Sequence, residues 1–297
     1  MFFEVKKDNP IIAWWSGGIA SAITCWLCIQ WFGLKNVRIV FIDTRNEDPD
    51  TYRFLKDCEN WYQCKIETIY SSEFTNIKDV WYKYLSLNTA TGAICSTHLK
   101  RIVREQFQKQ NRFSFQAFGF DIKETDRAIA MKINNPDARP IFPLIIELLT
   151  KNDLNKHLPK GLFKIEPPRA YKLGLQNNNC LGTGCVQGGI GYWQWIQKNI
   201  PELFDQMAII EHELTDLKGE PVTMLKDQSK GGGLVFLKPH PEYPNIKDIS
   251  MMKGRPPRPL FECNGFCGTN DLIPRTETEK EINYDIAERS NPLSRVG

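Results

Sequence analysis

The fold is decided by the stretch Ile11-Ile12-Ala13-Trp14-Trp15-Ser16-Gly17-Gly18-Ile19-Ala20-Ser21. Its first five residues are an apolar run between Asn9-Pro10 and two glycines, which favours a buried strand. Ser16-Gly17-Gly18 then forms a turn in which two successive residues lack a Cβ, so backbone N–H groups can approach an anion. The apolar stretch Ile19–Phe32 contains no Pro or Gly and predicts a helix with its positive end at this turn. A phosphate-binding loop and an ordinary tight turn between strand and helix both satisfy this pattern.

Composition places the chain among ordinary soluble globular proteins. Its 297 residues suit one large domain or one domain with an appendage, and 41% are hydrophobic against 25% charged. The net charge of +3 is too small to indicate nucleic acid by itself. We find no signal peptide and no run near the roughly 18 apolar residues of a membrane helix. With nine cysteines, these features predict a cytoplasmic, reducing location and no membrane partner.

Three further strands are predicted along the first half of the chain. Val37–Ile42 is β-branched and apolar, and it ends in Asp43-Thr44, where a strand of an α/β sheet faces the ligand crevice. A helix follows to about Tyr62, capped by Asp50 or Thr51. The third and fourth strands are expected at residues 65–70 and 114–120. This alternation predicts an α/β fold with a parallel sheet flanked by helices.

A basic segment precedes the fourth strand. Cys95 leads a predicted helix that runs to about Gln110 and carries Lys100, Arg101 and Arg104. These cations form either a solvated basic face or a clamp for an anionic ligand.

The composition changes from about Pro159. Pro and Gly become frequent, the apolar strand runs stop, and helices are expected at residues 192–199 and 201–214. We therefore predict a nucleotide-binding α/β domain over residues 1–158 and a helical, loop-rich, cysteine-containing appendage over residues 159–297.

Two pairs of cysteines lie in glycine-rich turns of this appendage. They are Cys180 with Cys185 and Cys263 with Cys267. Four thiolates around one centre suit tetrahedral Zn²⁺ or a [4Fe–4S] cluster, whereas unrelated buried thiols are the alternative.

Six blocks then resemble, in order, the phosphoadenosine phosphosulfate reductase branch of the PP-loop family, which is adenine nucleotide alpha hydrolase-like and of the N-type ATP pyrophosphatase kind. They cover roughly residues 10–215. Ser16 to Ser21 resembles the SGGxDS loop, Phe41 to Thr44 with Asp48 to Tyr52 resembles the FxDTxxxxPET block, and Cys95 with Lys100 resembles a C-x4-K element. Gly119 with Glu124, Thr125 and Arg127, the segment 140–153, and Cys180 to Trp193 with Pro201 and Phe204 complete the series. The resemblance implies a HUP-like, Rossmann-like fold.

The same resemblance implies a set of site residues. Phosphates would lie on Ser16, Gly17, Gly18 and Ser21, the ribose or adenine beside Asp43 and Thr44, and the remaining phosphate charge on Lys100 and Arg127. The implied cofactor is ATP or a related adenine nucleotide, with Mg²⁺ as a further candidate. The implied reaction adenylylates a substrate and releases pyrophosphate, and an iron–sulfur cluster would direct it to sulfur transfer with a nucleic-acid or sulfur-donor protein partner.

Four positions depart from the family pattern. Ala20 replaces the loop aspartate, Asp121 replaces an arginine, Cys95-Ser96 replaces a double cysteine, and the sequence after Glu262-Cys263 diverges from the reductase tail. Two alternatives therefore stand beside the sulfur-transfer hypothesis. One is a non-catalytic regulator that senses nucleotide or associates with nucleic acid, and the other is a sulfonucleotide reductase.

Overall fold

Five parallel strands form the central sheet of the computed structural model, which describes residues 8–89, 92–150, 153, 165–229, 231–258 and 260. The strands are β1 (Ile11–Trp15), β2 (Val37–Ile42), β3 (Glu67–Ile69), β6 (Phe115–Ala117) and β7 (Pro140–Ile141). Their order is β3-β2-β1-β6-β7. β1 lies at the centre, with Ile11 paired to Val37 on one side and to Phe115 on the other. The predicted α/β fold with a parallel, Rossmann-like sheet is confirmed.

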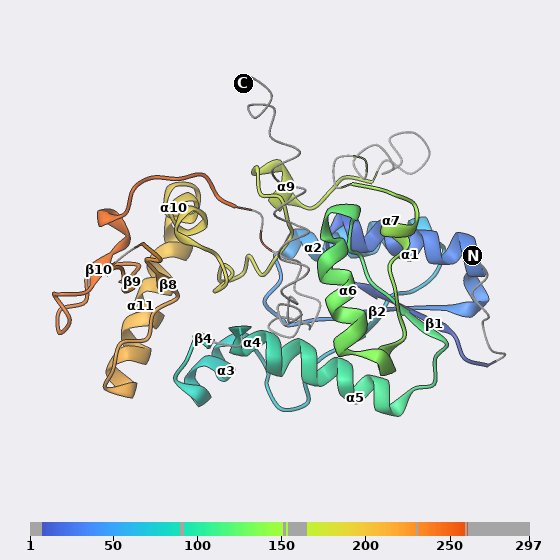
Figure 1. Cartoon of the computed structure of the whole chain (residues 1–297), viewed down its shortest axis with the longest axis horizontal. Helices are drawn as coiled ribbons and strands as arrows, with labels where there is room; N and C mark the ends of the chain where they lie inside the picture. The colour runs from blue at the N-terminus through green and yellow to red at the C-terminus, as the bar shows by residue number, and fades with distance from the viewer. Residues whose placement is uncertain are drawn as a thin grey trace, which may run out of the picture.

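Helices cover both faces of this sheet (Figure 1). α1 (Ile19–Phe32) and α2 (Pro49–Tyr62) pack against the β1 residues Ile11, Ala13 and Trp15. α5 (Ile102–Gln110) and α6 (Thr125–Asn134) pack against the alternate residues of β1. Every residue of β1 is buried, because successive side chains point to opposite, covered faces of the sheet.

The strand order places a topological switch point at the carboxyl ends of β1 and β6. The chain runs from β1 outward through β2 to β3, and then crosses to β6 on the other side of β1. Connections therefore leave these two neighbouring strands in opposite directions, which opens the position where such sheets bind ligands.

A second lobe lies to one side of the central sheet, at the left of Figure 1. Its elements are α10 (Ile190–Asn199), α11 (Pro201–Lys218), β8 (Leu225–Lys226), β9 (Leu234–Phe236), β10 (Lys247–Asp248) and η5 (Ile249–Met251). The two predicted helices are confirmed. A small sheet of β8 to β10, which the sequence analysis did not predict, follows these helices. These strands have two or three residues each, too few to show an alternating pattern.

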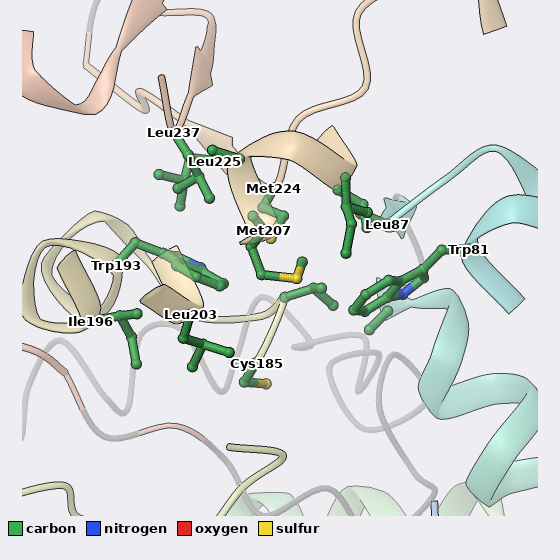
Figure 2. Packing of buried hydrophobic residues seen from close by; sticks show 14 of the residues in the cluster. Trp81, Leu87, Cys185, Trp193, Ile196, Leu203, Met207, Met224, Leu225 and Leu237 are labelled. Atoms are coloured by element: carbon green, nitrogen blue, oxygen red, sulfur yellow. The ribbon is translucent and has the colours of Figure 1, made fainter. Parts of the chain in front are cut away.

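The core of the second lobe also draws on the first half of the chain. Trp81 of α3 (Ile77–Tyr84) and Leu87 pack with Trp193, Met207 and their neighbours (Figure 2). The predicted domain boundary at 158/159 lies outside the described residues and stays a prediction. This shared core shows that residues around α3 pack with the second lobe although they lie far earlier in the sequence.

A buried carboxylate fastens the small sheet to α11. Glu211 is fully buried and accepts hydrogen bonds from the backbone N–H groups of Met224 (3.0 Å) and Leu237 (2.6 Å). Burial raises the pKa of Glu211 to about 8, although the two N–H donors act in the opposite direction.

Several element boundaries differ from the sequence-based expectations. α2 begins at Pro49 and is capped by Asp48, not by Asp50 or Thr51. The helix expected from Cys95 to Gln110 is confirmed as an unbroken helical stretch, which consists of α4 (Ile94–Ser96), the π-helical η2 (Thr97–Arg101) and α5. The third and fourth strands are shorter than predicted, since their ladders end at Ile69 and Ala117.

The remaining short elements connect these parts. They are η1 (Leu34–Asn36), β4 (Asn88–Thr89), β5 (Gly92–Ala93), η3 (Ile122–Glu124), η4 (Pro136–Ala138), α7 (Pro143–Ile146) and α9 (Arg169–Lys172). Within the described ranges, none of the helices combines the length and the apolar character needed to span a membrane.

Candidate functional site

The turn between β1 and α1 requires glycine at its centre. Gly17 has a φ of 84°, a conformation that residues with a side chain rarely adopt. A Cβ on Gly17 would lie 2.8 Å from Thr51 Cγ2 and 3.3 Å from Asn178 Nδ2. Both the backbone conformation and the close packing therefore exclude other residues, which sets this turn apart from a generic connection.

Ser21 braces this turn from inside. Its side chain is buried, and its Oγ accepts hydrogen bonds from Ser16 N and Ser16 Oγ, both at 3.0 Å. The same hydroxyl donates to Gly18 O at 2.9 Å. In this structure Ser21 thus fixes the shape of the loop, and the predicted contact between its hydroxyl and a phosphate stays a prediction.

The N-terminus of α1 is not capped by a side chain of its own turn. Gly18 is the N-cap residue, and the first turn contains no acidic residue. The Ile19 N–H donates instead to the hydroxyl of Tyr171, at 3.2 Å. The N-terminal N–H groups of a helix have no partner within the helix, so this end favours an acceptor or an anion.

The connection after β6 packs closely against the glycine loop. A Cβ on Gly119, just after β6, would lie 2.8 Å from Ser21 N. The β6 connection therefore lies directly against the start of α1. Asp121 then caps η3 by accepting from Lys123 N (3.0 Å), while Asp121 N donates to Glu124. This capping box gives a structural reason for an aspartate where the family pattern has arginine.

Asp43 and Thr44 lie at the end of β2 but differ in exposure and contacts. Asp43 Oδ1 accepts from Arg45 N (2.7 Å) and from the Tyr52 hydroxyl (2.9 Å). Thr44 is buried and donates to Glu47 Oε1 at 2.9 Å. Its hydroxyl also lies 3.9 Å from Cys180 Sγ. The end of β2 therefore contacts the segment that carries the first predicted cysteine pair.

Lys100 and Glu47 form a buried pair at this edge. Lys100 is 7% exposed, and its Nζ lies 3.9 Å from Glu47 Oε1. Burial raises the pKa of Glu47 above its ordinary value, and the opposing effects of Lys100 and Thr44 are smaller. Glu47 therefore holds the Lys100 ammonium at this edge of the sheet.

Arg127 lies in α6, which follows β6. Its guanidinium donates to Glu124 Oε1 at 2.9 Å and stacks on the ring of Phe120, 4.5 Å from the ring centroid. The fold thus places the predicted loop residues, Asp43, Thr44 and Lys100 at the carboxyl edge of β1 and β2, and Arg127 after the adjacent β6.

The predicted cysteine quartet is described only in part. Cys180 is half-buried beside Thr44, and Cys185 is buried where its N–H donates to the Tyr192 hydroxyl. Cys263 and Cys267 lie outside the described residues. Among the described residues, no three side chains of the types that bind metals gather at one point. The metal site therefore stays a prediction.

Residues 10–111 match the family model of the phosphoadenosine phosphosulfate reductase domain. Over this third of its length, the chain is similar to the phosphoadenosine phosphosulfate reductase-like branch of the PP-loop family. The match spans the glycine loop, the FxDT block and Lys100, so the resemblance expected from these blocks is confirmed. The predicted blocks after residue 111 lie beyond this match. No curated protein matches the chain.

Several solved structures are similar to this chain. A phosphoadenylyl-sulfate reductase from Candida auris, in a phosphate complex, is 14% identical with a TM-score of 0.46, covering 58% of this chain and 82% of that chain. An NH3-dependent NAD synthetase from Campylobacter jejuni is 16% identical with a TM-score of 0.35, over 52% and 70%. A U34-tRNA thiolase with its [4Fe-4S] cluster, from Methanococcus maripaludis, is 14% identical with a TM-score of 0.36, over 86% and 85%.

Three residues of the site were not predicted from the sequence. Glu47 is the buried partner of Lys100, Tyr171 lies on the α1 N-terminus, and Asn178 donates to Gly17 O at 2.9 Å. Glu47 lies inside the block that resembles FxDTxxxxPET, which could have identified it. Tyr171 and Asn178 contact positions more than 150 residues away in sequence, and no local pattern indicates such pairs.

Proposed function

We propose that this chain binds ATP or a related adenine nucleotide with its phosphates on the Ser16–Gly18 turn and the N-terminus of α1. The observation that carries the proposal is the Gly17 turn at the carboxyl edge of the sheet, next to a helix end that lacks a capping side chain of its own. The first N–H groups of a helix have no partner within the helix and lie at the positive end of its dipole, and both features favour a phosphate there. Mg²⁺ would accompany the nucleotide phosphates.

The reaction we propose is adenylylation of a substrate. A nucleophile on the substrate attacks the α-phosphorus, the bond to the bridging oxygen breaks, and pyrophosphate leaves with that oxygen. Such a transfer depends on positioning and on neutralising charge. Lys100 is suited to the second task because its ammonium is buried at the carboxyl edge of β1 and β2, 3.9 Å from Glu47 Oε1. Arg127 is the second cation in the proposal.

Sulfur transfer is the use of the adenylate that we favour. The support is the position of Cys180 Sγ, 3.9 Å from the Thr44 hydroxyl at the end of β2. The proposal includes a cytoplasmic setting, in which thiols stay reduced, and a nucleic-acid or sulfur-donor protein partner. It also includes Zn²⁺ or a [4Fe–4S] cluster on Cys180, Cys185, Cys263 and Cys267.

Metal analysis with a visible spectrum distinguishes the two centres, using protein purified without oxygen. About four iron atoms per chain with broad absorption, as Cys₄-ligated cubanes show, would support sulfur transfer. About one zinc ion without colour would make the quartet structural. If the purified chain contains neither iron nor zinc in stoichiometric amounts, the result contradicts a metal site on the cysteine quartet.

Two measurements on the full chain test the core of the proposal. Isothermal titration calorimetry with ATP and Mg²⁺ should show saturable binding, and a pyrophosphate-release assay with candidate acceptors should show turnover. Absence of ATP binding would contradict the proposal. Binding without pyrophosphate release for any acceptor would favour the second function below.

The second function is nucleotide sensing without turnover, and one observation favours it. Ala20 replaces the carboxylate of the family loop, and it is buried against the Gly119 connection. The Ala20→Asp variant restores that carboxylate. If it releases pyrophosphate while the natural chain binds ATP and remains inert, sensing is supported; turnover by the natural chain contradicts it.

The reductase alternative depends on Cys263, which lies outside the described residues. It predicts thioredoxin-dependent release of sulfite from a sulfonucleotide. Loss of that release in Cys263→Ser would support it, and absence of sulfite from the natural chain would exclude it.

A further inference from the structure

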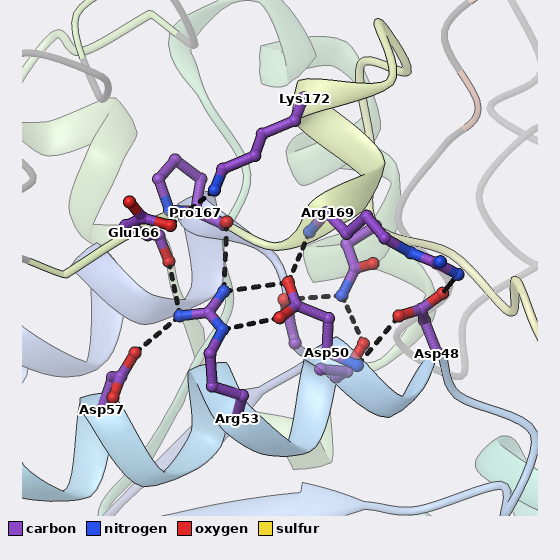
Figure 3. A network of polar contacts seen from close by, with 11 residues as sticks. Asp48, Asp50, Arg53, Asp57, Glu166, Pro167, Arg169 and Lys172 are labelled. Atoms are coloured by element: carbon purple, nitrogen blue, oxygen red, sulfur yellow. Dashed lines mark hydrogen bonds and ion pairs between the residues drawn. The ribbon is translucent and has the colours of Figure 1, made fainter.

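Residues 165–178 form a strap that is fastened to the N-terminal half of α2. Arg53 donates to the backbone carbonyls of Glu166 (3.0 Å) and Pro167 (3.2 Å). Arg169 N donates to Asp50 Oδ2 at 2.6 Å, and its guanidinium pairs with Asp48 at 2.5 Å. Figure 3 shows that these contacts form one continuous network between the strap and α2.

The far end of the strap is fastened to the glycine turn itself. The Asn178 amide donates to Gly17 O and to Thr51 Oγ1, both at 2.9 Å. Asn178 is buried, so these hydrogen bonds are shielded from water. The strap therefore has two anchors, one on the α2 network and one on the turn.

Tyr171 lies in the strap between these two anchors. Its hydroxyl oxygen accepts the Ile19 N–H at 3.2 Å, and its ring packs against the hydrophobic cluster that lies under α1. The Ile19 N–H is one of the N-terminal amides that a phosphate oxygen would use. A neutral hydroxyl oxygen therefore occupies the hydrogen-bonding position of an anionic one.

We propose that the strap is a latch on the phosphate loop, and that phosphate binds only when the Tyr171 hydroxyl leaves the Ile19 N–H. This inference rests on the proposed nucleotide site and adds a regulatory step to it. Ligand phosphate and the tyrosine hydroxyl compete for the same amide. The apparent affinity for phosphate is then the intrinsic affinity multiplied by the fraction of molecules in which the latch is open.

Tyr171→Phe isolates the hydroxyl because it keeps the ring and its packing. Removing a competing neutral hydrogen bond should strengthen phosphate binding about twofold to tenfold, which corresponds to the net strength of one such bond. The matched control is Tyr243→Phe. It also removes one tyrosine hydroxyl that has a backbone partner, since the Tyr243 hydroxyl donates to Gly219 O at 3.2 Å in the second lobe.

The experiment measures the dissociation constant of inorganic pyrophosphate by calorimetry for the natural chain and the two variants, with thermal melting as the check on folding. Tighter binding by Tyr171→Phe alone supports the latch. Equal binding by all three overturns the latch and leaves the nucleotide site standing. Weaker binding by Tyr171→Phe overturns it as well, because the hydroxyl would then be a ligand contact. Absence of binding in all three contradicts the nucleotide site and, with it, the latch.

Discussion

The N-termini of α1 and α2 lie side by side at the edge of the sheet, but the backbone N–H groups at the two ends find their hydrogen-bond acceptors in different ways. The Asn178 amide joins them by bonding both Gly17 O and Thr51 Oγ1. α2 is self-sufficient, since Asp48 caps it by accepting from Asp50 N (2.8 Å), Pro49 occupies its first position and Asp50 supplies negative charge. α1 begins at a glycine without a capping side chain and without an acidic residue in its first turn.

The difference shows which end of the fold is open to a ligand. Capping and an acidic first turn neutralise a helix end from within its own sequence. The end of α1 depends on a group from elsewhere, and in this structure that group is the Tyr171 hydroxyl. An anion would therefore be accepted at α1 and rejected at α2.

The largest expected effect is that of Gly17→Ala. The positive φ and the close approach to Thr51 force the turn to change shape, so ATP affinity should fall by about 100-fold, which equals about 2.7 kcal/mol. The control is Gly219→Ala, which has a similar φ of 73° and an open position at the end of α11. Calorimetry with ATP should give near-natural affinity for the control. If both variants bind ATP with equal affinity, the result contradicts a phosphate site at the N-terminus of α1.

Lys100→Met should have the next largest effect. Losing a charged partner of the phosphates should weaken ATP binding by about tenfold to 100-fold. The substitution also leaves the buried Glu47 carboxyl without the Lys100 ammonium. The double variant Lys100→Met with Glu47→Gln removes that carboxyl charge, so it separates an effect on protein stability from an effect on ATP binding. Calorimetry should show the same weak affinity in the single and double variants, and natural affinity in the exposed control Lys35→Met. Recovery of affinity in the double variant would contradict a direct role for Lys100.

Asp48→Ala tests the self-sufficient end. It removes the α2 cap and the partner of Arg169, so the free energy of unfolding should fall by about 1–2 kcal/mol. Asp48→Asn keeps a capping oxygen and should recover most of the loss. Urea unfolding measures both variants. Equal stability of Asp48→Ala and the natural chain would show that α2 does not depend on this cap.

Asp50 gives the smallest expected effect, and it depends on pH. Its hydrogen bond to Arg53 is the main cause that holds the pKa of Asp50 below its ordinary value, and the Arg169 N–H adds to it. The stabilisation is therefore complete above the ordinary aspartate pKa of about 4 and is lost as the pH falls through the lower folded-state pKa. Urea unfolding should find Asp50→Asn less stable than the natural chain at neutral pH, with the difference shrinking in acid. A difference that is constant with pH would contradict this role.

The elements around the first helix could be predicted because their signals are local. The apolar run of β1, the two glycines and the uninterrupted α1 follow one another within about twenty residues, and the structure places each of them as expected. The same holds for β2 and the polar residues at its end. Contiguous patterns of this kind determine a strand and a helix before any tertiary contact forms.

The contacts that complete the site were not predictable in this way. Tyr171 and Asn178 reach the loop across more than 150 residues, and the small sheet of β8 to β10 has strands too short to show a period. Asp121 illustrates another limit. In the sequence comparison, Asp121 stands where the family pattern has an arginine, so the pattern indicates a lost phosphate contact. The structure shows that Asp121 caps η3.

Hydrogen–deuterium exchange with and without ATP and Mg²⁺ tests most directly whether the nucleotide lies on the N-terminus of α1. Our account predicts that ATP slows exchange in peptides that contain residues 16–20 and leaves the first turn of α2 unchanged. Unchanged exchange at residues 16–20 under saturating ATP, or protection at the start of α2 in its place, would contradict it.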